Sequence, residues 1–157
     1  MSIGEIAAKS GVARSTVYSH HRQVYEIVPD YKRYILDKHM KMLKKAKRRA
    51  NTKVKRLYEQ NLIFILQNRK IFELFLKEAD RGVIEQMVLR LKPRIMAYAR
   101  LPRGADKVFM VYANEVVGLI VGWGKKGFME KELQVVLANI MYLTESMRER
   151  LKPLLEC

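Results

Sequence analysis

Hydrophobic residues recur at intervals of three and four along most of the chain, which is the spacing of one face of an α-helix. Gly and Pro interrupt this pattern at only a few points, and the alternation typical of strands is almost absent. The segments between the interruptions predict helices over residues 2–10, 13–20, 29 to a break near 51–52, 54–67, 70–78, 82–99, 106–122 and 129–151. Within residues 82–99, Pro93 predicts either a kink or the start of a new helix. The sequence therefore predicts an all-α fold.

The first two predicted helices have the pattern of a helix-turn-helix. Ser2 and Glu5 form a Ser-x-x-Glu capping box, and Gly11 can adopt the left-handed conformation that ends a helix. The second helix contains Arg14, which can reach guanine edges or phosphates. It also carries small hydrogen-bond donors suited to phosphate oxygens, namely Ser15, Thr16, Tyr18, Ser19 and His20. These residues favour a helix that enters the major groove of DNA; the polar face of an ordinary helical hairpin is the alternative.

The charge of the chain indicates an anionic partner. Lys and Arg number 31 against 16 Asp and Glu, which gives a formal net charge of +15. Nucleic acid is the first candidate for such a partner and an acidic membrane surface the second. Twelve of the basic residues lie between Lys32 and Arg56, where Asp37 is the one acid. This basic segment is consistent with a second nucleic-acid surface, a membrane-binding helix or a solvated face.

An interrupted apolar stripe accompanies the basic segment. The stripe is narrow and poor in aromatic residues, which disfavours insertion into a membrane. Its predicted members are Leu36, Met40, Leu43, Ala50, Val54 and Leu57.

Residues 6–28, IAAKSGVARSTVYSHHRQVYEIV, resemble the end of the DNA-binding domain of TetR-family transcriptional regulators. The shared pattern is Ile-Ala-x-x-x-Gly-Val, then Arg-Ser-Thr-x-Tyr-x-His, then Tyr-Glu-Ile. Residues 112–133, YANEVVGLIVGWGKKGFMEKEL, are similar to the penultimate helix and following turn of a subgroup common in Gram-positive bacteria. The opening also resembles MerR-type regulators, but the winged segment of that family has no counterpart after His21.

The TetR resemblance implies a DNA-binding head over residues 1–28 and a helical ligand-binding and dimerisation body over residues 29–157. It implies a homodimer that binds a palindromic operator in double-stranded DNA, acts as a repressor and is released by a small-molecule effector. It also implies base-edge contacts by Arg14 and Ser15. Phosphate or nearby contacts are implied for Ser2, Thr16, Tyr18 and His20.

The chain departs from the family pattern at three points. The family has a further helix before the position of Ser2. His21 stands where an aromatic residue is usual, and Val24 stands where a lysine usually meets a phosphate. These departures support a second hypothesis, in which the chain is a TetR-like interaction protein that no longer reads DNA and dimerises with another regulator.

The last two predicted helices are strongly apolar. The first is apolar almost all round, and Gly118 and Gly122 lie one turn apart, where they allow close approach of a neighbouring backbone. Two such helices from each subunit would form a four-helix interface, as in the resembled family, and a monomer core is the alternative. The predicted interface residues are Tyr112, Val116, Leu119, Trp123, Leu133, Leu137, Ile140 and Thr144. Residues 122–127 also fit G-x-G-x-x-G, but a helix precedes them where the dinucleotide motif needs a strand, so they predict a helix end and turn.

The remaining residues give weaker predictions. Tyr58, Asn61, Glu73 and Tyr98 are polar residues in apolar segments and are candidates for a ligand pocket. The three histidines do not have the spacing of metal ligands, and the single cysteine is the last residue, so we expect no metal, cofactor or enzymatic activity. Neither a signal peptide nor a membrane-spanning segment is expected, which favours a cytoplasmic protein.

Overall fold

The computed structural model describes residues 24–48, 53–102 and 104–155, and this part of the chain is all-α, as predicted. It contains no strand. Its elements are α3 (Val24–Arg48), α4 (Val54–Gln67), α5 (Arg69–Lys77), α6 (Gly82–Leu89), α7 (Lys92–Ala99), α8 (Asp106–Lys125), the short 3₁₀ helix η1 (Glu130–Glu132) and α9 (Leu133–Leu155).

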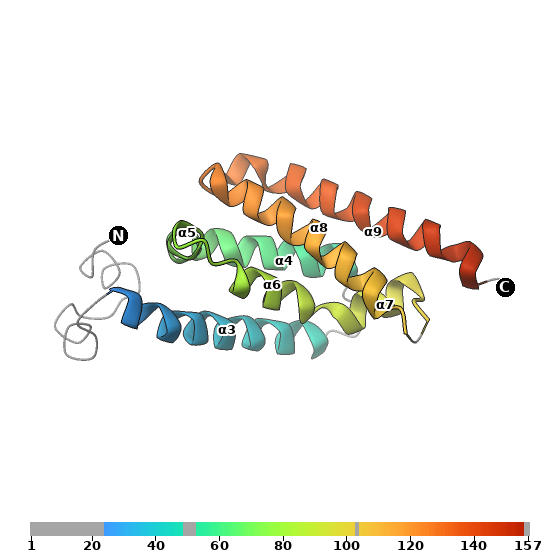
Figure 1. The fold of residues 1–157 in the computed structure, drawn as a ribbon, viewed down its shortest axis with the longest axis horizontal. Coiled ribbons are helices and arrows are strands. Elements are labelled where there is room, and N and C mark those ends of the chain that lie inside the picture. The colour runs from blue at the N-terminus through green and yellow to red at the C-terminus, as the bar shows by residue number, and fades with distance from the viewer. Residues whose placement is uncertain (1–23, 49–52, 103, 156–157) are drawn as a thin grey trace.

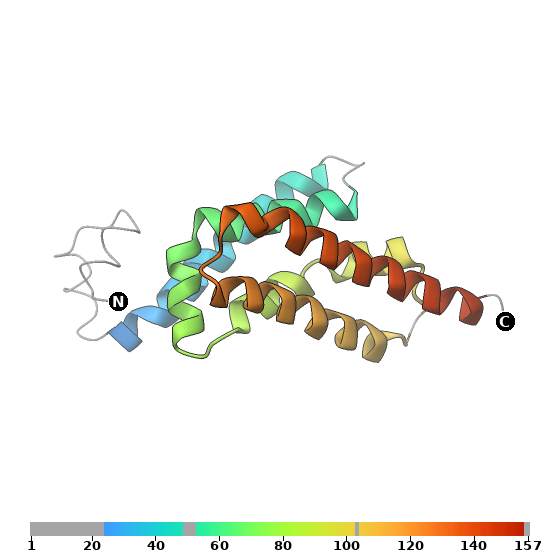
Figure 2. The same cartoon turned by 90° about the horizontal axis from the view of Figure 1, so that it is seen from above.

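The helices form an elongated bundle (Figure 1). Helices α8 and α9 run antiparallel to each other and pack together along their length. Helix α8 also packs on α5 and α6, whereas α9 packs on α4 and α7. Helix α3 lies along the other side of the bundle, where it contacts α6, and the view from above shows the same arrangement (Figure 2). The core therefore lies between α3 on one side and the α8–α9 pair on the other. None of the described helices combines the length and apolar composition needed to cross a membrane.

Most helix boundaries follow the predicted pattern. Helix α4 spans the predicted residues 54–67, and the break predicted near residues 51–52 falls between α3 and α4. The predicted segment 82–99 is two helices, because Pro93 lies in the first turn of α7, where its missing N–H costs no helical hydrogen bond. The predicted start of the long helix at Pro29 is wrong, since α3 begins at Val24 and continues through this proline. The last helix begins at Leu133, after η1, and extends to Leu155.

The buried stripe of α3 differs from the predicted one. Leu43 is buried as predicted, but Leu36 and Met40 are only half-buried. The stripe instead includes Tyr31, Ile35 and His39, which the predicted stripe left out, and its members are separated by steps of four residues with a last step of three. The buried residues of α3 are Tyr31, Ile35, His39, Leu43 and Ala46. A histidine thus occupies a core position of this helix.

The G-x-G-x-x-G segment is a helix end and turn, as predicted. The N–H of Phe128 donates to Trp123 O at 3.1 Å, and the N–H of Gly127 donates to Gly124 O at 2.9 Å. These two bonds define a Schellman motif, and Gly127 has the positive φ of 86° that the motif requires. The rings of Trp123 and Phe128 meet edge to face at 5.1 Å, which is the hydrophobic contact that accompanies such a motif. The glycines therefore serve the turn and its packing.

Gly124→Ala is expected to lower the free energy of unfolding by about 1–3 kcal/mol, because the new Cβ would overpack the core. It would lie 2.4 Å from Leu76 Cδ1 and 2.6 Å from Phe128 Cζ. The Phe128 ring is fully buried, with the rings of Trp123 and Phe72 at 5.1 and 6.4 Å, so it has no room to move away. Thermal or urea unfolding would measure the change.

Gly122→Ala is the matched control, because a Cβ at Gly122 meets nothing within 4 Å. Since alanine favours the helix over glycine, this variant is expected to gain up to about 1 kcal/mol. Equal losses in the two variants would contradict the packing argument.

Candidate nucleic-acid interface

The predicted DNA-contacting residues belong to the N-terminal segment. Ser2, Arg14, Ser15, Thr16, Tyr18, Ser19 and His20 lie outside the described residues, as does almost all of the predicted head over residues 1–28. The described part of the candidate interface is therefore α3, which leads from this segment into the body.

Helix α3 separates its charges from its apolar residues. Its buried stripe faces the body, whereas Lys38, Lys41, Lys44 and Lys45 are all exposed. This arrangement follows from the helical period, since the lysines fall between the four-residue steps of the stripe. The helix therefore presents a row of cations to solvent.

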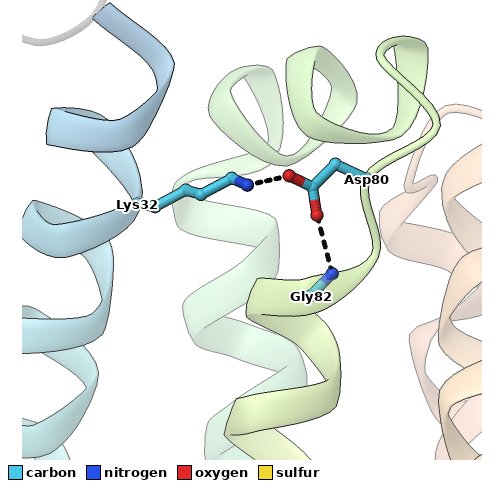
Figure 3. Close-up of polar contacts among 3 residues, drawn as sticks. All are labelled: Lys32, Asp80 and Gly82. Carbon is cyan, nitrogen blue, oxygen red and sulfur yellow. Dashed lines mark hydrogen bonds and ion pairs between the residues drawn. The ribbon is translucent and has the colours of Figure 1, made fainter.

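The first turns of α3 are joined to the body through one carboxylate (Figure 3). Lys32 forms an ion pair with Asp80, which lies in the turn between α5 and α6. The other carboxylate oxygen of Asp80 accepts a hydrogen bond from the N–H of Gly82 at 2.9 Å. Because Gly82 is the first residue of α6, Asp80 satisfies a free N–H at the start of α6 and binds α3 at the same time.

A second connection joins α3 to α6 and α4 through His39. Arg90 donates from Nη1 to the carbonyl oxygen of Leu36 at 2.8 Å, and the same nitrogen lies 3.4 Å from His39 Nδ1. His39 Nε2 lies 2.6 Å from Asn61 Oδ1. Since a guanidinium can only donate, Nδ1 is the acceptor, and Nε2 carries the proton that it donates to Asn61. His39 is therefore the neutral Nε2–H tautomer.

Burial holds His39 in this neutral form. The side chain is fully buried, and desolvation lowers the pKa of His39 from 6.5 to about 4. The hydrogen bond with Asn61 raises the pKa, and the positive charge of Arg90 lowers it. A proton on Nδ1 would point at the guanidinium, so protonation would disrupt the contact between α3 and α6.

Two residues predicted for the ligand pocket are instead polar members of the core. Asn61 is the partner of His39, and Tyr58 begins a buried chain of hydroxyl groups. Thr144 donates to Ile140 O at 2.9 Å, so it accepts from Tyr112 at 2.6 Å, and Tyr112 in turn accepts from Tyr58 at 2.7 Å. This direction is consistent with the pKa of Tyr58, which is raised. Burial is the largest cause, and the hydrogen bond that Tyr58 donates to Tyr112 raises the pKa further. The chain joins α4, α8 and α9.

The other two predicted ligand residues lie apart from these. Tyr98 of α7 donates to Glu145 of α9, and the Arg148 guanidinium lies 4.9 Å from the centre of the Tyr98 ring. Glu73 is half-buried on α5. The structure therefore does not bring the four predicted residues together in one pocket.

Two grooves lie on the surface of the described helices. A groove of about 270 Å³ between α3 and α4 is lined by Met42, Lys45, Ala46, Gln60, Ile63, Phe64 and Gln67. Another, of about 220 Å³, lies between α8 and α9 and is lined by Val108, Val111, Tyr112, Glu115, Leu143, Met147, Arg150 and Leu151. Tyr112 lines the second groove and also belongs to the hydroxyl chain.

The residues predicted for the dimer interface pack inside the single chain. Seven of them are buried, namely Tyr112, Val116, Trp123, Leu133, Leu137, Ile140 and Thr144, whereas Leu119 is half-buried. In the single chain, the seven buried side chains therefore belong to its own core, and Leu119 remains partly exposed. The sequence pattern could not separate core from surface here, because α8 is apolar on nearly every side.

Different residues of the same two helices face solvent. Val111 of α8 is 61% exposed, and Val135 and Tyr142 of α9 are 61% and 72% exposed. Gly118 and Gly122 are also exposed, with nothing within 4 Å of a Cβ built on either. We call these five residues the outer face of the α8–α9 pair. Its three side chains are large, apolar and exposed, which often marks a protein contact, although Val111 shares a groove with Glu115 and Arg150.

Three contacts of α3 were missed by the sequence interpretation. His39 falls on the four-residue spacing of Tyr31, Ile35 and Leu43, so a polar residue at an apolar position was the available signal. No comparable local signal points to Asp80 or Arg90, because each acts across more than forty positions of sequence.

No protein-family model, curated protein or solved structure matches the chain.

Proposed function

We propose that the protein is a sequence-specific DNA-binding transcriptional regulator of the TetR type that represses transcription. The observation that carries the proposal is the sequence from Gly11 to His20, which predicts a turn followed by a helix that carries Arg14 and small hydrogen-bond donors. The formal net charge of +15 supports an anionic partner. Helix α3 supports it further, because it is fixed to the body through Asp80, Arg90 and His39 and could transmit movement of the body to the N-terminal segment.

The proposal includes a homodimer formed through the outer face of the α8–α9 pair. Two chains of the same large positive charge repel each other unless the contact surface lacks cations. Residues 108–124 contain one charged side chain, Glu115, and residues 133–144 contain none. The outer face therefore combines exposed apolar side chains with little charge, which favours a second copy of this chain as its partner. A dimer would present two heads to the two halves of a palindromic operator.

In this proposal a small-molecule effector releases the operator by shifting α3 relative to the body. The contacts of α3 with Asp80, Arg90 and Asn61 supply a mechanism, because a ligand that repacks α4 or α6 would change the position of Asn61 or Arg90. A changed angle of α3 would alter the spacing of the two heads and spoil their fit to the half-sites.

Arg14→Ala is the variant that tests the reading of DNA sequence. We expect it to weaken operator binding by about 1–3 kcal/mol and to relax the preference at one base position, because a guanine contact would be lost. Binding titrations against operator duplexes substituted one base pair at a time would measure both effects. Lys131→Ala, an exposed cation of η1, is the control for the lost charge. An equal fall in affinity for every duplex would indicate that Arg14 contacts a phosphate, and would contradict a contact with a base edge.

The alternative is a TetR-like interaction protein that dimerises with another regulator and does not read DNA. His21 and Val24 favour it, since each departs from the resembled pattern. Under this alternative the wild-type protein would show no preference among duplexes, and the outer face would bind a different chain.

A further inference from the structure

The cations at the far end of α3 form a surface of their own. Helix α3 ends at the same end of the bundle at which α4 begins, and both views show this end opposite to Val24 (Figures 1 and 2). A helix of 25 residues is about 37 Å long, at 1.5 Å per residue. We call the five cations at this end the distal corner. They are Lys44, Lys45, Lys53, Lys55 and Arg56, and all five are exposed.

Nothing within the described chain neutralises the distal corner. Among the described residues, none of its five cations forms an ion pair. From Lys38 to Tyr58 the sequence has ten Lys or Arg and no Asp or Glu. Glu59, one turn after Lys55, is the next acid along the chain.

The distal corner places cations at the N-terminus of helix α4, where acidic residues would be more favourable. The N-terminus of a helix carries a partial positive charge and favours acidic residues. Helix α4 has no acid in its first turn and no side-chain cap, and Lys53, Lys55 and Arg56 surround this end. This arrangement costs some stability of the isolated chain, and an anion bound at the corner would offset that cost.

We propose that the distal corner binds the phosphate backbone of duplex DNA without regard to sequence. This contact lies at the opposite end of α3 from the N-terminal segment, so it goes beyond the operator contact of the proposed function. A duplex supplies a regular row of phosphates, to which clustered Lys and Arg on two adjoining helix ends are suited.

Duplex DNA is favoured over an acidic membrane by the residues between the cations. Stable binding to a membrane surface needs apolar side chains that enter the lipid. Leu43, Ala46, Val54 and Leu57, which alternate with the cations along the two helices, are all buried in the core. The exposed apolar side chain beside the corner is Ile63, in the groove that Lys45 also lines, and one such side chain falls short of the apolar face that membrane binding needs.

The test compares two full-length variants, each with four cations changed to Gln. The corner variant carries Lys44→Gln, Lys45→Gln, Lys53→Gln and Arg56→Gln. The control variant carries Lys107→Gln, Lys125→Gln, Lys126→Gln and Lys131→Gln, which are exposed cations of α8, the turn after it and η1. Both variants lose the same formal charge. Binding to a duplex of arbitrary sequence is titrated over a series of salt concentrations.

The corner variant is expected to bind at least tenfold more weakly at 0.1 M salt than the wild type. Its log–log salt slope should be shallower by about 3–4, since each phosphate contact contributes about 0.9. The control variant should retain the wild-type slope. The corner variant should also keep or raise its thermal midpoint, because repulsion between neighbouring cations is relieved.

Three results would overturn the proposal. Equal losses in the two variants would assign the effect to total charge, and an unchanged slope in the corner variant would exclude the contact. Loss of binding to vesicles containing phosphatidylserine, with duplex binding intact, would assign the corner to a membrane. The ratio of operator to arbitrary-duplex affinity reports on the proposed function separately, because Arg14→Ala should change this ratio and the corner variant should not.

Discussion

Acidification from pH 6.5 to pH 4 is expected to lower the free energy of unfolding by about 3 kcal/mol through His39 alone. In the unfolded chain His39 has its ordinary pKa of 6.5, whereas burial holds the pKa of the folded side chain at about 4. The unfolded state therefore binds more protons between these two values, and stability falls as the pH falls through this window. Each unit of difference corresponds to about 1.4 kcal/mol. Once the pH is well below 4, both states are protonated and this contribution no longer changes.

Urea unfolding at pH 7, 6, 5 and 4.5 would measure this loss, with His39→Gln as the comparison. The variant keeps a polar side chain opposite Asn61 but has no group that titrates in this range. Its stability at pH 7 should be lower, because the contact with Arg90 is altered, and its stability should change less between pH 6.5 and pH 5. Parallel pH profiles for the variant and the wild type would contradict the buried neutral histidine. Carboxylates elsewhere titrate equally in both proteins and cancel in the difference.

Val135→Lys is expected to raise the dissociation constant of the proposed homodimer by about 100-fold. Val135 is 61% exposed on the outer face of the α8–α9 pair, so the change leaves the core of the chain intact. In a symmetric dimer the substitution places a charge on both copies of an apolar contact. Like charges brought together at an interface cost several kcal/mol, and about 2.7 kcal/mol corresponds to this factor of 100.

Ile63→Lys is the matched control, because it adds the same charge at an exposed apolar position of α4. Sedimentation equilibrium of both variants and the wild type at several concentrations would give the dissociation constants. We expect the control to dimerise like the wild type. A monomeric wild type at micromolar concentration, or equal weakening in both variants, would rule out the outer face as the dimer contact.

Helix positions could be predicted from the sequence because they depend on local pattern. The spacing of apolar residues gave the bounds of α4, and Pro93 marked the division between α6 and α7. The turn after α8 could also be predicted, because Gly127 follows a helix and no strand precedes it. The start of α3 could not, since the pattern places the start at Pro29, whereas the helix begins at Val24 and contains this proline.

The polar contacts of the body could not be predicted, because they join residues distant in sequence. Tyr58 and Tyr112 are 54 positions apart, His39 and Asn61 are 22 apart, and Tyr98 and Glu145 are 47 apart. In each pair one residue, Tyr58, Asn61 or Tyr98, is a polar group that the sequence alone suggested for a ligand site. Its distant partner satisfies the hydrogen bonding of that group. The dimer prediction had the same difficulty. An apolar helix shows which residues avoid water, but only the packing of α8 and α9 separates those that face the core from those that remain exposed.

The most direct test of the account is a competition titration of the full-length protein with the DNA upstream of its own coding sequence. Binding would be measured at 50 and 200 mM salt, with an unrelated duplex of equal length as competitor. We expect binding that persists against an excess of competitor at the higher salt, and that loses this preference in Arg14→Ala. Binding that falls equally for both duplexes as salt rises, with no preference for either, would contradict a sequence-reading regulator. The charge of the chain would then be its only contribution to DNA binding.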